Sequence, residues 1–232
     1  MKHVPKLLNE IGSGRSFLIR GHGTKVNQIK PSIGRKYKGP WSSVLAKERE
    51  SLDRFKKWSL PYLSSIPEEP LDWLCLMQHY RCPTRLLDFT TNPLVGLFFA
   101  SDPSQDEDGE VIIVNPPAVK AASEVNGDVF AATAPFVYYP PHYCGRIIGQ
   151  SGCFIVCPNP NEGLNLRSIR KVVIPITFKK EIRNELSMLG ISYRLLFPGL
   201  AGICEDLNDN LLYDVDFQIM CDEMVAEFPH LL

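Results

Sequence analysis

Arg20 and Gly21 are the first residues along the chain whose types could do chemistry. They follow the short apolar run Ser16–Ile19. An arginine at the end of a strand can hold a phosphate through its paired N–H donors, and a neighbouring glycine lets a ligand approach the backbone. The same dipeptide also fits a surface arginine beside a turn glycine, so both interpretations stay open at this point.

A denser group of polar side chains lies between two apolar segments and includes His79, Arg85, Asp88 and Thr90. Charged side chains are rarely buried without a partner, so the group predicts either an internally bonded network or the wall of a pocket. Arg85 and Asp88 would point to opposite faces of a strand. We therefore expect Asp88 to cap the following helix or to reach Arg20, rather than to pair with Arg85.

The segment RIIGQSGCF supplies further candidates, Arg146 and Gln150, ahead of a glycine that indicates a bulge or a close backbone approach. His22 and His142 could do acid–base chemistry, although each also fits an ordinary loop histidine. The sequence contains no H-E-x-x-H, G-x-S-x-G or P-loop motif. This excludes zincins, elbow-type serine hydrolases and Walker NTPases.

The composition limits partners and location. The formal net charge is -1, from 25 basic and 26 acidic residues, which argues against a dedicated nucleic-acid binder. The seven cysteines are odd in number and show no paired zinc-ligand spacing. With no secretory signal and no apolar run of about 20 residues, we expect reduced thiols, no metal site, no membrane partner and a cytoplasmic protein.

These residues need elements to position them, and the apolar spacing predicts an α+β fold with a mixed, mainly antiparallel sheet packed with helices. The expected helices span residues 43–58, 71–80, 92–100 and 179–189. The expected strands span residues 16–19, 85–89, 110–114, 136–139, 146–148, 153–157 and 171–176.

Several of these segments are similar to one known family. FLIRG resembles the (F/Y)-R-G motif of the FRG-domain family, and QHYRCPTRLLDFTTNPLVGLFFA resembles its most recognisable segment. RIIGQSGCF and LFPGLAGI resemble two later segments of the same family, and the four segments follow one another here in the family's order. The resemblance covers about residues 17–205, so residues 1–232 are expected to form a single FRG domain. Arg81, Phe89 and Gly199 depart from the usual glycine, tryptophan and aspartate.

The order of these elements is also similar to the ADP-ribosyltransferase fold. That resemblance implies NAD as substrate, with Arg20 on the NAD phosphates and Thr90 in the place of a serine/threonine motif. Gly21, His79 and Arg85 would complete the NAD-binding residues. Gln150 stands where the resemblance implies a glutamate, and a glutamine has no charge for a developing cation. Either Asp88 supplies that charge, or the domain binds a nucleotide without cleaving it.

The resemblance thus predicts an ADP-ribosyltransferase or NAD glycohydrolase whose catalytic residues are Arg20, Asp88, Thr90 and Gln150. Such an enzyme would act as a bacterial or phage toxin or antiphage-defence effector, with a protein or nucleic-acid acceptor and an inhibitory partner. Two alternatives remain. One is a non-catalytic nucleotide-binding or protein-interaction module, and the other is a nuclease that uses His22, His79 or His142.

Overall fold

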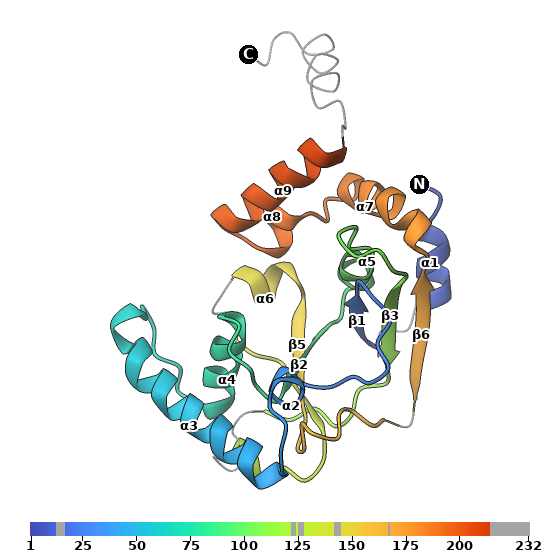
Figure 1. Ribbon diagram of the computed structural model, residues 1–232. Helices are drawn as coiled ribbons and strands as arrows, with labels where there is room; N and C mark the ends of the chain where they lie inside the picture. The colour runs from blue at the N-terminus through green and yellow to red at the C-terminus, as the bar shows by residue number, and fades with distance from the viewer. Residues whose placement is uncertain (13–16, 122–123, 125–127, 142–144, 167, 214–232) are drawn as a thin grey trace.

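The computed structural model describes residues 1–12, 17–121, 124, 128–141, 145–166 and 168–213. Within them, six strands form one sheet in the order β4-β5-β2-β1-β3-β6 (Figure 1). The strands are β1 Leu18–His22, β2 Leu86–Thr90, β3 Gly109–Val114, β4 Phe136–Tyr138, β5 Gly152–Val156 and β6 Ile169–Ile174.

The pairing of these strands is antiparallel throughout. The α+β prediction is therefore confirmed, and the sheet is simpler than the mixed one expected. The described residues add one isolated parallel bridge, between Val119 and Val137. Antiparallel strands can keep one face on an apolar core and the other under loops, and that is the arrangement here.

The longer helices of the described residues are α1 Val4–Ile11, α3 Trp41–Ser59, α4 Pro70–His79, α5 Pro93–Ala100, α7 Lys179–Met188 and α9 Leu200–Tyr213. Short helical segments are α2 Ser32–Lys36, α6 Gly145–Gly149, α8 Tyr193–Leu196, η1 Leu60–Tyr62, η3 Val129–Ala131 and η4 Ile176–Phe178. None of the described helices combines the length and apolar character that crossing a membrane requires.

Most predicted elements are confirmed to within a few residues, but residues 146–148 are wrong as a strand because they lie in helix α6. Ile147 is buried there, and a Cβ on Gly149 would lie 2.2 Å from the carbonyl oxygen of Leu195. Packing against α8 and β5 thus overrides the strand preference of two consecutive isoleucines.

Helices α1, α5 and α7 cover one face of the sheet around β1, β3 and β6 (Figure 1). Ile19, Val111 and Val172 face this layer and pack with Leu97 of α5 and Ile182 of α7. A second core lies under α3 and α4 against β4 and β5. The other face of the central strands is covered in part by the segments that contain Ile29 and Leu164.

The sheet opens between β1 and β2. These strands share one registered pair, Ile19 with Thr90, whereas β1 and β3 pair along five positions. Past that single pair, the backbone groups of Asp88 are not bonded to β1 by a ladder. The separation leaves room for side chains from both strands.

Gly21 packs closely against helix α5. A Cβ on Gly21 would lie 2.0 Å from the carbonyl oxygen of Gly96, and one on Gly96 would lie 2.4 Å from Cγ2 of Ile19. The side of Gly21 that lacks a Cβ is therefore taken up by helix α5, so a close backbone approach here is that of the helix. The two glycines set the distance between α5 and β1.

Candidate functional site

A cleft of about 210 Å3 opens where β1 and β2 separate. Five predicted site residues line it together: Arg20, Gly21, Asp88, Thr90 and Gln150. The remaining lining consists of Arg146 and the apolar residues Ile19, Phe89, Val95 and Phe99. A few polar groups in mostly apolar walls are typical of small-molecule sites.

Arg20 bridges the gap between the two strands. Its Nη1 donates to the backbone oxygen of Asp88 and lies 3.6 Å from Oδ2 of the same residue. Its Nε donates to Nε2 of His22 at 2.9 Å. The side chain is 15% exposed, and neither bond uses the Nη2 donors, which gives the guanidinium capacity for an anionic ligand.

His22 serves as the acceptor that orients this arginine. Burial, followed by the positive charges of Arg20, Arg35 and Lys171, lowers the pKa of His22 to about 3. The imidazole is therefore neutral near pH 7, and its Nε2 lone pair is already occupied by Arg20. This arrangement does not fit His22 as the acid–base group of a nuclease.

Asp88 is the acidic residue of the cleft. Its side chain is 60% exposed, although it lies on the central strand β2. The helix that follows is capped by Asn92, whose Oδ1 accepts from the N–H of Leu94. Asp88 therefore does not cap this helix, and it faces Arg20 as the second expectation stated.

Thr90 and Gln150 are held by local hydrogen bonds. The Thr90 hydroxyl donates to the carbonyl oxygen of Gln150 at 2.7 Å and accepts from the N–H of Asn92 at 2.9 Å. The Gln150 amide nitrogen donates to the carbonyl oxygen of Leu196 at 2.9 Å. Because the nitrogen faces Leu196, the amide oxygen is left to accept from a ligand hydroxyl.

A smaller cavity of about 40 Å3 adjoins the cleft. The two share Asp88, Phe89, Arg146 and Gln150, and His79 lines the smaller one. Burial and then the charge of Arg146 lower the pKa of His79, which favours its neutral form. His79 is thus next to the main cleft and close to the same polar residues.

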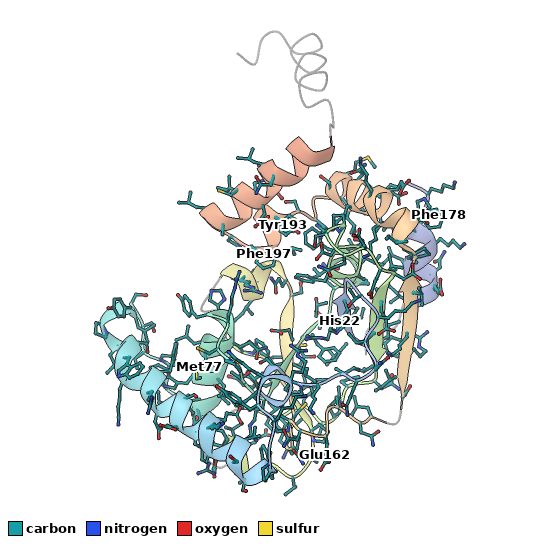
Figure 2. All side chains as sticks on the ribbon, in the orientation of Figure 1. His22, Met77, Glu162, Phe178, Tyr193 and Phe197 are labelled. Carbon is teal, nitrogen blue, oxygen red and sulfur yellow. The ribbon has the colours of Figure 1, made fainter. Side chains whose placement is uncertain are left out.

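Arg146 is the site residue that sequence reasoning noticed but left out of the predicted set. It lines both cavities, and its guanidinium carbon lies 4.7 Å from the centre of the Phe197 ring. Figure 2 shows Phe197 beside Tyr193 near α6, and their ring centres are 6.0 Å apart. The signal that could have found Arg146 is its place in RIIGQSGCF, one helical turn before Gln150.

Arg85 is the predicted NAD-binding residue that the structure does not bring to the cleft. Its side chain is 0% exposed and pairs with Glu48, with Nη2 2.8 Å from Oε2. The Arg85 N–H also donates to Glu48 Oε1, and the guanidinium carbon lies 4.6 Å from the Phe130 ring centre. These contacts join helix α3 to the start of β2.

Three further possibilities are a cysteine nucleophile, a metal site and His142. Burial, and then the charge of Asp88, raise the pKa of Cys153 to about 12, so its thiol stays protonated and is a poor nucleophile near pH 7. Among the described residues, no three His, Cys, Asp or Glu side chains are grouped closely enough to hold a metal ion. His142 lies outside the described residues.

Comparison with known proteins gives one match. Residues 15–109 match the family model of the FRG domain. This part of the chain is therefore similar to the FRG domain. The match contains Arg20, Asp88 and Thr90 and ends before Arg146 and Gln150, so the likeness of those later segments to the FRG family stays a prediction. No curated protein and no solved structure matched significantly.

Proposed function

We propose that this chain binds NAD in the cleft and cleaves its nicotinamide–ribose bond, as an ADP-ribosyltransferase or NAD glycohydrolase with an ADP-ribosyltransferase-like fold. The supporting observation is that Arg20 of β1, Asp88 and Thr90 of β2, and Gln150 of the turn between α6 and β5 line one cleft. Arg146 lines it too. Two guanidiniums and one carboxylate in the lining of one cleft suit a ligand with an anionic pyrophosphate and a cationic ring.

To cleave the nicotinamide–ribose bond, the protein has mainly to position NAD and to stabilise the positive charge that develops on the ribose. The bond between ribose C1 and the nicotinamide nitrogen breaks, and its electron pair returns to the ring, which leaves as neutral nicotinamide. C1 becomes an oxocarbenium-like cation. The oxygen of water, or of an acceptor group, adds to C1 and releases a proton to solvent. A fixed negative charge beside C1 lowers this barrier.

The residues divide these tasks by charge. Arg20 holds the pyrophosphate through its Nη2 donors, while its bonds to His22 and Asp88 fix its direction. Asp88 supplies the negative charge that Gln150 lacks, and the Gln150 amide oxygen accepts from a ribose hydroxyl. Thr90 positions Gln150 rather than touching the ligand, because its hydroxyl is already bonded on both sides.

In this proposal the nicotinamide ring lies in the main cleft, on the side where His79 and the smaller cavity adjoin it. A neutral imidazole avoids repulsion with the cationic ring of NAD, and its lowered pKa keeps it neutral. Phe89 and Phe154 give this cavity aromatic and apolar walls. The chain would then act in the cytoplasm as a toxin or defence effector, with a protein or nucleic-acid acceptor where transfer occurs.

A non-catalytic nucleotide-binding module is the second candidate, and one observation favours it. Arg20 is already bonded to His22 and Asp88, and Gln150 occupies the position where a carboxylate would serve catalysis. The same cleft could then hold a nucleotide without bond cleavage. A nuclease has less support, because Nε2 of His22 already accepts a hydrogen bond from Arg20 and is not available for acid–base chemistry.

Mass spectrometry of nicotinamide released from excess NAD tests the proposal. The wild type is expected to release nicotinamide, and Arg20→Lys, which keeps the charge but loses the fork, is expected to slow release at least tenfold. Arg49→Lys, on the exposed face of α3, is the matched control and should behave as wild type. No release by the wild type, together with binding of NAD in calorimetry, would favour the binding module.

A further inference from the structure

We propose that the end of helix α3 and the turn after it insert into the surface of an anionic lipid bilayer. Four large apolar side chains, which we call the α3 tip, are exposed there: Trp58 at 68%, Leu60 at 48%, Tyr62 at 87% and Ile66 at 60%. Figure 1 shows this end of α3, in pale blue to teal, extending away from the sheet.

The α3 tip is not needed to close the core. The earlier turns of α3 bury Val44 and Leu52 at 1% and 4% exposure, and Phe55 packs edge-to-face on Trp73 at 6.3 Å. The apolar side chains at the end of the helix then turn to solvent. Several exposed apolar side chains close together in sequence, at the end of a firmly packed helix, indicate an interaction surface rather than a loose core.

Helix α3 and the segment before it carry an excess of basic residues, which favours an anionic partner. The last turns of α3 contain Arg54, Lys56 and Lys57, and Asp53, Glu68 and Glu69 flank residues 54–66. Residues 25–57 contain ten basic and three acidic residues, although the whole chain has a net charge of -1. One of the three acids, Glu48, is buried against Arg85. Basic residues beside exposed apolar ones attract a negatively charged membrane surface.

The residue types favour lipid over other anionic partners. Trp58 and Tyr62 have an apolar body and a polar tip, which suits the boundary between headgroups and acyl chains. Leu60 and Ile66 are aliphatic and cannot stack on nucleic-acid bases as aromatic side chains do. The expectation of no membrane partner came from the lack of a spanning segment, and a surface anchor needs no such segment.

The position of the α3 tip leaves the cleft free. Helix α4 lies between α3 and the strands β2 and β5 (Figure 1). The cleft is lined from β1, β2, α5, α6 and the turn after α6. Membrane binding and NAD binding can therefore be measured separately, and neither proposal rests on the other.

Co-sedimentation with vesicles tests this proposal. Wild-type protein is expected to bind vesicles of phosphatidylcholine with one-third phosphatidylserine, and to bind pure phosphatidylcholine weakly. Leu60→Ser/Tyr62→Ser should lower binding at least tenfold, because two apolar side chains no longer enter the bilayer. Lys57→Ala should lower it about fivefold. Leu200→Ser, which changes an 80% exposed leucine on α9, is the matched control and should leave binding unchanged.

Trp58 provides a direct readout of insertion. It is the most exposed of the tryptophans, while Trp73 is 5% exposed, so a blue shift on adding anionic vesicles should be lost in Trp58→Tyr. Equal sedimentation of wild type and Leu60→Ser/Tyr62→Ser would overturn the proposal. So would vesicle-independent dimerisation, or binding of a single-stranded oligonucleotide, that the same double variant abolishes, because each would assign the α3 tip to another partner.

Discussion

Single residues in the cleft combine structural and chemical roles. Arg20 joins β1 to β2 at the point where their ladder stops, since its Nη1 bonds the Asp88 carbonyl oxygen. Its direction is set by His22. Replacing Arg20 by alanine would thus remove both a ligand contact and a bridge between strands. Conservative variants and changes at Asp88 are more informative for this reason.

His22 should titrate far below an ordinary histidine. Its pKa of about 3 lies below the reference value of 6.5, so between these values the unfolded chain binds more protons than the folded one. The free energy of unfolding should therefore fall as the pH is lowered from 6.5 towards 3. NMR titration of the imidazole measures the pKa. His22→Asn, which keeps an acceptor but does not titrate, should flatten this dependence. An NMR pKa near 6.5 would contradict the assignment.

The Glu48–Arg85 ion pair should contribute to the free energy of unfolding and should not contribute to ligand binding. Both side chains are 0% exposed, so Glu48→Gln leaves a buried arginine without its counter-charge and should cost about 3–5 kcal/mol in denaturant unfolding. Glu48→Leu/Arg85→Met should recover part of this loss. NAD binding per folded molecule should not change in either variant. A Glu48→Gln protein as stable as wild type would contradict this account.

At the scale of elements, the packing of α5 on β1 depends on two glycines. Gly21→Ala would place a Cβ 2.0 Å from the Gly96 carbonyl oxygen and 2.7 Å from the Ala100 nitrogen. These are backbone atoms that cannot move alone, so we expect a loss of about 1–3 kcal/mol in the free energy of unfolding. Gly152→Ala is the control, because its Cβ would meet its nearest neighbour at 3.6 Å. Equal stability of the two variants would contradict the close approach.

Most elements could be predicted from their sequence pattern, and the exceptions have physical reasons. Helix α5 begins with Asn92-Pro93 and has an ordinary start signal, so its bounds followed directly. Helix α6 has two β-branched residues that favour a strand, and only contacts with α8 and β5 decide its form. Helix α1 was overlooked, although Val4, Leu7 and Ile11 show helical spacing and are buried.

The site could be predicted in part for a similar reason. The motif segments identified Arg20, Asp88, Thr90 and Gln150 without revealing their distances, because strand order and the opening between β1 and β2 are properties of the whole sheet. Arg85 was expected in the site because it lies in the same motif segment as Asp88 and Thr90. Its partner, Glu48, is 37 residues away, and no local pattern indicates that pairing.

At the scale of the whole molecule, Glu185 ties the N-terminal residues to helix α7. Its carboxylate accepts from the N–H groups of Lys2, His3 and Val4 at 2.6, 2.9 and 2.7 Å, so helix α7 holds the first turn of α1. Burial acts to raise the pKa of Glu185, but these hydrogen bonds outweigh it and lower the pKa below 4.5. The contact spans more than 180 residues.

Glu185→Gln should lower the free energy of unfolding by about 1–3 kcal/mol, because one carboxylate oxygen is replaced by a donor that faces N–H groups. The stabilisation from Glu185 is present above pH 4.5 and is lost as the pH falls through its lower folded value. The variant should therefore differ most from wild type near pH 7. Glu181→Gln, exposed on the same helix, is the control in urea unfolding at several pH values. A constant difference down to low pH would contradict this role.

The most direct measurement is nicotinamide release by Asp88→Asn at NAD concentrations that saturate binding, with affinity measured by calorimetry on the same sample. Asp88 is 60% exposed, so the change should leave the fold intact, and Asp53→Asn on α3 is the matched control. The account predicts that Asp88→Asn binds NAD within about tenfold of wild type but releases nicotinamide at least a hundredfold more slowly. Release by Asp88→Asn at the wild-type rate would contradict the claim that Asp88 supplies the catalytic charge.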